Sequence, residues 1–319
     1  MSGFMVANNE HLIRSQLWSK DITQLFLDDL FAMRFVRTIT DFPDGTTLNI
    51  PRIGLAEQAD FAEGQAIKYN KMDTGNFQFQ IDQYKYSANA ISEKFKRDSF
   101  YSAEVLSMFA PRQHRALMEG FETRVWDRAN AGQAANNLNI INEGAHRWVG
   151  SGTSQTMALA DFTKARLSLK KAGVPLNNLV AVVDPTVAYA IENQTNAVSL
   201  LSPMPKWGDM VHGGLTSGFQ FRFNLYGFDV YESNYLPRNI AETINSKTTT
   251  TGVANFFFSA APGDTLPLIS AFRQMPTVYS EFNKDLQQTE YLTICEYGVA
   301  LYRPENLCTV ITDVGSVSY

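Results

Sequence analysis

The stretch NFQFQIDQYKYSANAIS spans residues 76–92. Together with the shorter TTLNIPRIGL, residues 46–55, it predicts a long two-stranded β-ribbon. Apolar and polar residues alternate in both stretches, and in both the alternation changes phase once, at Pro51 and after Gln83. Such phase changes indicate β-bulges and strong twist. The residues between the strands are charged and typical of a loop. Ten residues of strand span about 33 Å, so the ribbon leaves the body of the protein.

A projecting ribbon of this kind needs support from outside itself, because two strands alone are marginally stable in water. We expect the support to come from another copy of the chain. The ribbon's large apolar side chains are therefore candidate subunit-interface residues: Phe61, Phe77, Phe79, Tyr84 and Tyr86. The alternative is that the ribbon folds back on its own subunit as an ordinary hairpin.

Residues 17–37, before the ribbon, predict an amphipathic helical arm. Apolar residues recur near helical spacing, and Trp18, Ile22 and Phe26 are further candidates for a subunit interface. The pattern fits a helix packed on a neighbour and a helix packed on its own core equally well.

The composition bounds the classes of function. Only 18% of the 319 residues are charged, below the roughly 25% of typical soluble domains, which fits extensive subunit contacts or a large core. The net charge of −5 argues against a dedicated nucleic-acid binder, although non-specific contact with DNA stays open. Cys295 and Cys308 lie in or beside apolar runs and predict buried free thiols. The sequence shows no signal peptide and no membrane span, so we expect no membrane partner.

The central and C-terminal parts predict a mixture of helices and strands. A main helix is expected from Pro111 to Asn130. Residues 161–193 predict a helix, a buried strand and a second helix, with Asp161 and Asp184 as the helix caps. FQFRFNLYGFDVYES, residues 219–233, alternates strongly enough to predict strand with a turn near Gly227, and a polar insert, ETINSKTTTTG, residues 242–252, precedes an apolar strand at ANFFFSA. From residue 266 to 319 the pattern is almost entirely β.

The search for catalytic and ligand-binding motifs finds no phosphate-binding loop, no dinucleotide fingerprint and no metal-ligand spacing. We therefore predict no catalytic residue, no cofactor and no metal. Asp184 is the best single enzyme candidate, because it follows a buried strand, where open α/β sheets bind ligands. A helix cap before Pro185 explains the same residues without a substrate.

The order of elements resembles that of the HK97-like major capsid proteins of tailed bacteriophages. TLNIPRIG, FQFQIDQYKYSANAIS, ADFTKARLSLKKAGVP, LVAVVDPTVAYAI and YGFDVYESNYLP look like stretches of the podovirus-like members. The resemblance implies an α+β fold with an N-terminal arm at 1–41, an extended β-ribbon loop at 42–95, a peripheral domain with a spine helix at 96–157, an axial domain at 158–265, and closing strands of the peripheral domain at 266–319.

The same resemblance implies a non-enzymatic capsid protein that assembles into pentamers and hexamers of an icosahedral shell around double-stranded DNA. Its ribbon would lie across a neighbouring subunit and its arm would reach another. Expected partners are a separate scaffolding protein, a portal, packaged DNA through non-specific contact and a decoration protein, with assembly in the host bacterial cytoplasm and a final location in the virion capsid. The alternatives are an encapsulin-type compartment and, more distantly, a cytosolic α/β enzyme that uses Asp184.

Overall fold

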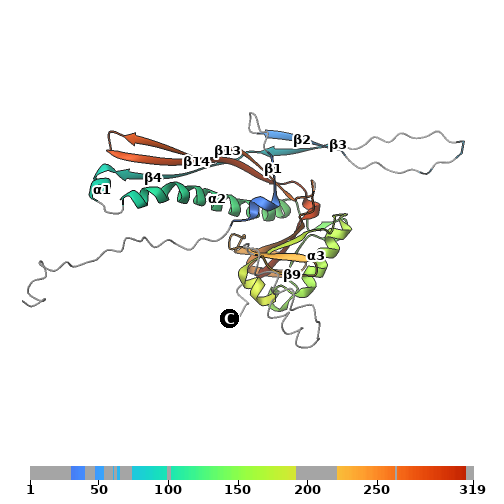
Figure 1. The fold of residues 1–319 in the computed structure, drawn as a ribbon. Coiled ribbons are helices and arrows are strands. Elements are labelled where there is room, and N and C mark those ends of the chain that lie inside the picture. Colours follow the sequence, from blue (N-terminus) through green and yellow to red (C-terminus); the bar gives the residue numbers. More distant parts are fainter. Residues whose placement is uncertain are drawn as a thin grey trace, which may run out of the picture.

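The computed structural model describes residues 30–39, 47–53, 60, 63–64, 74–98, 102–191, 221–262 and 264–313. These residues form two large β-sheets, two small two-stranded sheets and one long helix (Figure 1). A separate pair of strands, β2 (Thr47–Ile53) and β3 (Thr74–Gln80), emerges beside the first sheet. The architecture is the expected α+β mixture. We call the part built on the first sheet the peripheral domain and the part built on the second sheet the axial domain.

The peripheral domain is a four-stranded sheet with one helix along one face. Its strand order is β1 (Val36–Ile39), β13 (Leu268–Asn283), β14 (Gln288–Leu301) and β4 (Gln83–Ser92). The first pair is parallel and the other two are antiparallel. Helix α2 (Ser102–Ala135) runs beside this sheet (Figure 1), and the short helix α1 (Glu93–Asp98) follows β4.

Helix α2 is longer than the sequence predicts, because it does not restart at Pro111. The helix begins before the proline, at Ser102, and ends after Asn130, at Ala135. Proline removes one backbone hydrogen bond and is unfavourable in a helix interior. Here Pro111 lies on the exposed side, while Phe121 and Trp126 are buried on the other side. Tertiary packing of that face therefore outweighs the local signal.

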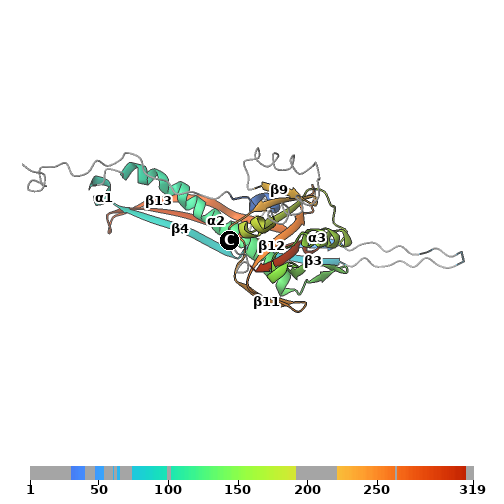
Figure 2. The same cartoon turned by 90° about the horizontal axis from the view of Figure 1, so that it is seen from below.

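The axial domain is built on a seven-stranded sheet, which Figure 2 shows from below. The strand order is β7 (Arg147–Val149), β15 (Cys308–Asp313), β12 (Lys247–Ser259), β8 (Leu179–Val183), β10 (Phe228–Glu232) and β9 (Phe221–Leu225), and β11 (Ile240–Ile244) pairs with β12. Smaller elements are η3 (Ala32–Phe35), β5 (Ile140–Ile141), β6 (Gly144–Ala145), η4 (Thr153–Gln155) and η5 (Pro304–Asn306).

Both faces of the axial sheet are covered, which explains why all five residues of β8 are buried. Ala181 and Val183 share one core with Phe257 and helix α3 (Leu159–Lys171). Val180 and Val182, on the opposite face, belong to a second core that also contains residues of α2 and of the peripheral sheet. This second core joins the two domains.

The predicted helix, strand and helix of residues 161–193 are present over the described part. Helix α3 starts at Leu159, slightly earlier than expected, and the Asp161 carboxylate accepts a hydrogen bond from the Ala158 backbone N–H at 2.9 Å. Gly173 ends the helix with a φ of +76°, a conformation that glycine adopts without strain. Residues 185–191 form the second helix, directly after Asp184.

Two of the expected domain boundaries need correction. β4 and α1 belong to the peripheral domain rather than to the ribbon, because β4 pairs with β14 along its whole length. β15 lies inside the axial sheet, between β7 and β12, and is not a closing strand of the peripheral domain. The polar insert at residues 242–252 lies in the β11–β12 hairpin.

Candidate subunit interfaces

The ribbon is anchored to its own subunit at its root. β2 and β3 are antiparallel, with Leu48 opposite Phe79 and Ile50 opposite Phe77. Phe79 is fully buried in a small core with Ile269 of β13. The structure therefore corrects the interface prediction for Phe79, which packs within its own chain. Phe77 is half-buried, with its ring edge-on to Tyr302 at 5.2 Å.

The chain leaves the ribbon at a tightly packed crossing. A Cβ atom at Gly298 of β14 would lie 2.5 Å from the Gln80 carbonyl oxygen and 3.0 Å from the Ile81 Cα, so only glycine allows this approach. Asp82 follows at once and forms ion pairs with Arg124 and Arg128 of α2. The returning strand thus breaks at residues 81–82 and continues as β4 in another sheet. This break, and not a pair of bulges, explains the phase change near Gln83.

The outer face of the peripheral sheet carries exposed aromatic side chains. Tyr86 lies opposite Ile294 and Tyr84 opposite Glu296. Residues directly opposite each other share a face, and the alternate residues, among them Thr293 and Cys295, are buried on the α2 side. Tyr84 and Tyr86 are 54% and 73% exposed. They are available to a neighbouring molecule, and their role at a subunit interface stays a prediction.

The root of the arm is held by a buried carboxylate. Phe31 packs against Trp126, and the Ala32 backbone N–H donates to Glu122 of α2 at 2.8 Å. The Trp126 Nε1–H donates to the same carboxylate at 3.2 Å. Burial raises the pKa of Glu122 above its ordinary value, although these hydrogen bonds act in the opposite direction. The arm and ribbon-tip candidates Trp18, Ile22, Phe26 and Phe61 lie outside the described residues.

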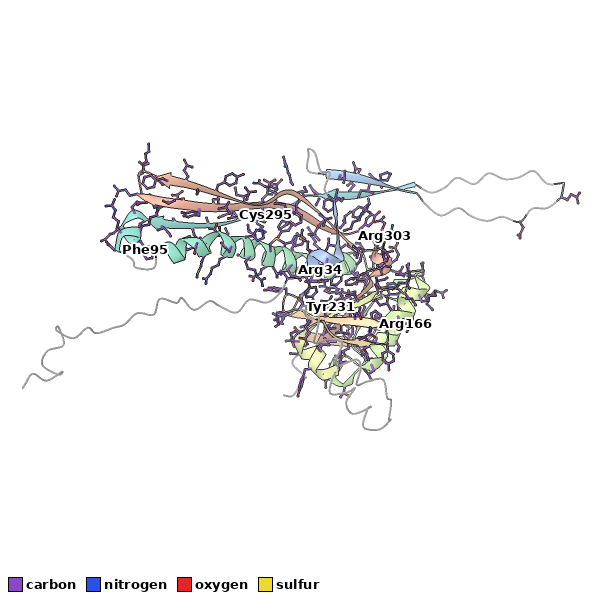
Figure 3. The ribbon with its side chains drawn as sticks, in the orientation of Figure 1. Arg34, Phe95, Arg166, Tyr231, Cys295 and Arg303 are labelled. Carbon is purple, nitrogen blue, oxygen red and sulfur yellow. The ribbon has the colours of Figure 1, made fainter. Side chains whose placement is uncertain are left out.

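A second polar cluster ties the arm root to the base of the ribbon. Asp264 accepts hydrogen bonds from Arg37 of β1, from Arg303 at 2.9 Å and from the Tyr302 hydroxyl at 3.3 Å. Both guanidinium groups also lie over the Tyr302 ring, at 5.6 and 5.2 Å from its centroid. Figure 3 shows Arg303 where the peripheral and axial domains meet. These contacts connect three segments that are far apart in sequence.

Asp184, the best enzyme candidate, is occupied by structural contacts. Its Oδ2 accepts the Thr186 backbone N–H at 3.1 Å, as a helix cap does. Its Oδ1 accepts from Arg238 at 2.7 Å in an ion pair. The helix cap and this ion pair together explain why the Asp184 carboxylate can be buried.

The described residues contain no cluster of three metal-ligating side chains. His146 is buried, with its ring nitrogens 3.0 Å from the Gly144 carbonyl and 3.1 Å from the Glu305 carbonyl, and His114 is exposed. The two cysteines are buried and free, and burial raises the pKa of Cys295 to about 11. Among the described helices, none combines the length and the apolar character that crossing a membrane requires.

Sequence reasoning missed the exposed apolar residues at the far end of β13 and β14. Phe282 and Tyr279 are about half exposed, and Leu286 in the following turn is 64% exposed. The signal was present in the alternation of TVYSEF, residues 277–282, which resembles that of an ordinary half-buried strand. Only the structure shows that both faces of this end of the strand are exposed, since residues 277–282 are all exposed.

Comparison with known proteins identifies the family. A family model described as phage capsid protein matches residues 78–310, which is more than half of the chain. No curated protein matches the sequence significantly. Among solved structures, the capsid of cyanophage P-SCSP1u is similar with a TM-score of 0.71 and 14% identity, over 97% of this chain and 94% of that one.

Two further solved structures agree with this result. The capsid asymmetric unit of cyanophage Pam1 has a TM-score of 0.68 and 12% identity, over 99% of this chain and 100% of that one. The asymmetric unit of the bacteriophage PhiM1 mature capsid has a TM-score of 0.65 and 12% identity, over 93% of this chain and 91% of that one. At such identities the structures show a shared fold, and the family model adds the class of protein. The chain belongs to the phage capsid protein family and is a major capsid protein with the HK97-like fold.

Proposed function

We propose that copies of this chain form the pentamers and hexamers of an icosahedral shell around packaged double-stranded DNA. In this shell the ribbon of each subunit lies across a neighbour, and the arm reaches another subunit. The protein functions by binding other copies of itself, and it catalyses no reaction. Interfaces of standard size, about 1,600 Å², span micromolar to picomolar affinity, so shell closure can supply stability that no single contact provides.

The observation that supports this proposal is the confinement of the ribbon's packing to its root. Phe79 and Ile81 are buried at the root, whereas Gly75 and Asn76, nearer the tip of β3, are exposed. A two-stranded ribbon fixed at one end is not stabilised along its length by its own subunit. A neighbouring subunit can provide the missing surface.

The proposed partners are those that the family resemblance implies. They are a separate scaffolding protein, a portal and a decoration protein, with assembly in the host bacterial cytoplasm. Contact with DNA would be non-specific. The net charge of −5 fits an inner wall that holds packed DNA without binding it strongly. Retention of DNA by shells should then depend weakly on salt, because few phosphate charges are neutralised.

A shortened ribbon tests the proposal. Ile53 lies opposite Thr74 at the end of the described ladder, so residues 54–73 can be replaced by a two-residue Asn-Gly turn. The root cluster stays intact, and the free subunit should keep its unfolding temperature. Negative-stain microscopy, with and without the candidate scaffolding protein, should show shells for the unaltered chain and none for the shortened chain.

A matched control replaces Ser246 by Gly in the β11–β12 turn, where Asn245 and Ser246 both have positive φ. This variant should assemble normally. Normal shells from the shortened chain would contradict the proposal. So would solution scattering that shows only compact monomers of the unaltered chain under all conditions, or shells that contain a protein cargo in place of DNA.

A further inference from the structure

Helix α3 presents a basic face to solvent on the axial domain. The helix packs on the core that contains Phe257, on the side of the axial sheet opposite the core that joins the two domains. Its one acidic residue, Asp161, is buried and accepts a hydrogen bond from the Trp148 Nε1–H at 3.0 Å. Lys164 lies over the ring of the same tryptophan, 4.5 Å from its centroid. The exposed positions of the helix are Ala160, Thr163, Arg166, Leu167, Lys170 and Lys171.

The exposed face of α3 thus carries three positive charges and no negative one, and little within the chain neutralises them. Figure 3 shows Arg166 in the axial domain, where its guanidinium donates to the Tyr226 carbonyl at 3.3 Å. Neither Arg166 nor Lys170 forms an ion pair with a described residue. The Lys171 Nζ donates to the Glu143 carbonyl at 3.2 Å, and the carboxylate of that residue lies 3.9 Å away and is 91% exposed. An exposed pair of this kind stabilises little, so Lys171 stays available to another anion.

Helix α2 shows the opposite arrangement of basic side chains. Three of its four arginines are paired with carboxylates of the same chain. Arg115 is paired with Glu119 at 2.8 Å. Arg124 and Arg128 both pair with Asp82 at the exit of the ribbon. The basic side chains of α2 therefore act within the subunit, whereas those of α3 have charge to offer to a partner.

The chemistry of the α3 face fits the phosphate backbone of double-stranded DNA. Duplex DNA carries one negative charge per about 1.7 Å of its axis, and the 13 residues of α3 extend over about 20 Å, so a duplex beside the helix offers phosphates to all three cations. A protein partner would need an apolar centre to the contact. Leu167, which is 59% exposed, is the only large apolar side chain among the exposed positions of this helix. These observations favour DNA over an acidic protein.

We infer that the exposed face of α3 binds the phosphate backbone of double-stranded DNA through Arg166, Lys170 and Lys171. This inference rests on the proposed function and names the part of the chain that contacts the packaged DNA. Binding is independent of base sequence, because contacts to phosphate carry no sequence information. It is weak for each subunit, since three cations release few counterions and the whole chain has a net charge of −5. In a filled shell this face then lines the interior.

Fluorescence anisotropy of the free subunit tests this binding, with a labelled duplex of about 30 base pairs and mixed sequence as the probe. Replacing Arg166, Lys170 and Lys171 together by glutamine should weaken binding at least tenfold at low salt. For the unaltered chain, the logarithm of the affinity should fall with the logarithm of the salt concentration with a slope of about −2.7, which corresponds to three neutralised phosphates. The slope should approach zero for the triple variant. Its unfolding temperature should not change, because all three side chains are exposed.

Two further variants are the controls. Exchanging Arg166 for lysine, and Lys170 and Lys171 for arginine, keeps the charge and should change the affinity less than threefold. Replacing the exposed side chains of three peripheral-domain residues by glutamine removes the same charge elsewhere and should also change it less than threefold; the residues are Lys85, Arg112 and Lys284. An equal loss in both glutamine variants would overturn the inference, because net charge alone would then explain the binding, and would leave the shell proposal standing.

Crosslinking in filled particles tests the same face in the assembled state. Leu167 is replaced by the photoreactive p-benzoylphenylalanine, and irradiated particles are analysed by denaturing electrophoresis. A slowly migrating form of the chain that nuclease removes should appear, and the unaltered chain should give none. Crosslinks to a protein in place of DNA, or no crosslinks in filled shells, would overturn the inference alone. If the unaltered chain forms no shells while α3 still binds the duplex, the proposed function fails and the DNA-binding face stands.

Discussion

The two sheets of this protein differ in how much of their surface the subunit itself covers. The axial sheet has helices on one face and the joint core on the other, and β8 is buried throughout. The peripheral sheet has α2 on one face only, and the opposite face exposes Tyr84, Tyr86 and Tyr279. The axial sheet therefore contains a complete core, whereas the peripheral sheet contains half of one. A capsid subunit needs both, a stable body and surfaces completed by its neighbours.

The largest expected effect is on the complete core. Phe257 is fully buried and its ring contacts Phe162 at 5.0 Å and Phe228 at 5.4 Å. Phe257→Ala should lower the free energy of unfolding of the free subunit by about 3–5 kcal/mol. Urea denaturation measures this change. A loss below about 1 kcal/mol would mean that the axial sheet does not carry the stability that its burial indicates.

A second prediction concerns the crossing where the ribbon leaves the peripheral sheet. Gly298→Ala places a methyl group against backbone atoms and should cost about 1–3 kcal/mol. Gly120→Ala is the matched control, because its Cβ meets nothing within 4 Å on the exposed side of α2. That substitution should stabilise the helix by about 1 kcal/mol. Equal effects in urea denaturation would contradict the role assigned to Gly298.

A third prediction concerns Glu122 at the arm root, where both domains meet. Because burial raises the pKa of Glu122, the folded state holds this proton at pH values where the unfolded chain has lost it. Stability should therefore fall as the pH rises above the ordinary value of 4.5, by up to about 1.4 kcal/mol per pH unit until the raised pKa is passed.

The variant Glu122→Gln keeps an oxygen acceptor for the Ala32 N–H and removes the titration. Urea denaturation at a series of pH values should show this fall for the unaltered chain, and a flatter profile for the variant. Parallel profiles would show that Glu122 does not carry the pH dependence.

The smallest effect on the free subunit is expected at the incomplete sheet. Tyr86→Ser removes a side chain that is 73% exposed, so the free energy of unfolding should change by less than about 0.5 kcal/mol. Assembly should weaken measurably, as light scattering would show. A variant that is unstable as a free subunit would mean that the outer face is already covered within the chain.

Local signals were sufficient to predict much of the axial domain. The alternation of FQFRFNLYGFDVYES gives β9 and β10 with a turn at Tyr226 and Gly227, and the cap at Asp184 followed from its position before Pro185. These features are decided by residues close in sequence. The fold class and the order of elements could also be predicted, through the resemblance to a capsid family.

The features that could not be predicted depend on contacts between distant residues. β4 looks like the continuation of a ribbon strand until it is seen to pair with β14. The helix continues through Pro111 because packing on the sheet outweighs a local penalty. The role of Glu122 depends on the arm root, which is 90 residues away. Which aromatic residues are exposed is equally a property of the assembled layers.

The placement of β15 has a consequence for synthesis. This strand lies between β7 and β12, and the ribosome makes it after every other strand of that sheet. A nascent chain therefore carries an open gap in its axial sheet, with unpaired backbone on both sides, until the residues around 308–313 have emerged. Pairing between strands that are far apart in sequence is slow, and until it is complete the unpaired strand edges are exposed to aggregation and to chaperones. A translation product that stops before residue 308 therefore lacks this strand and an intact axial sheet.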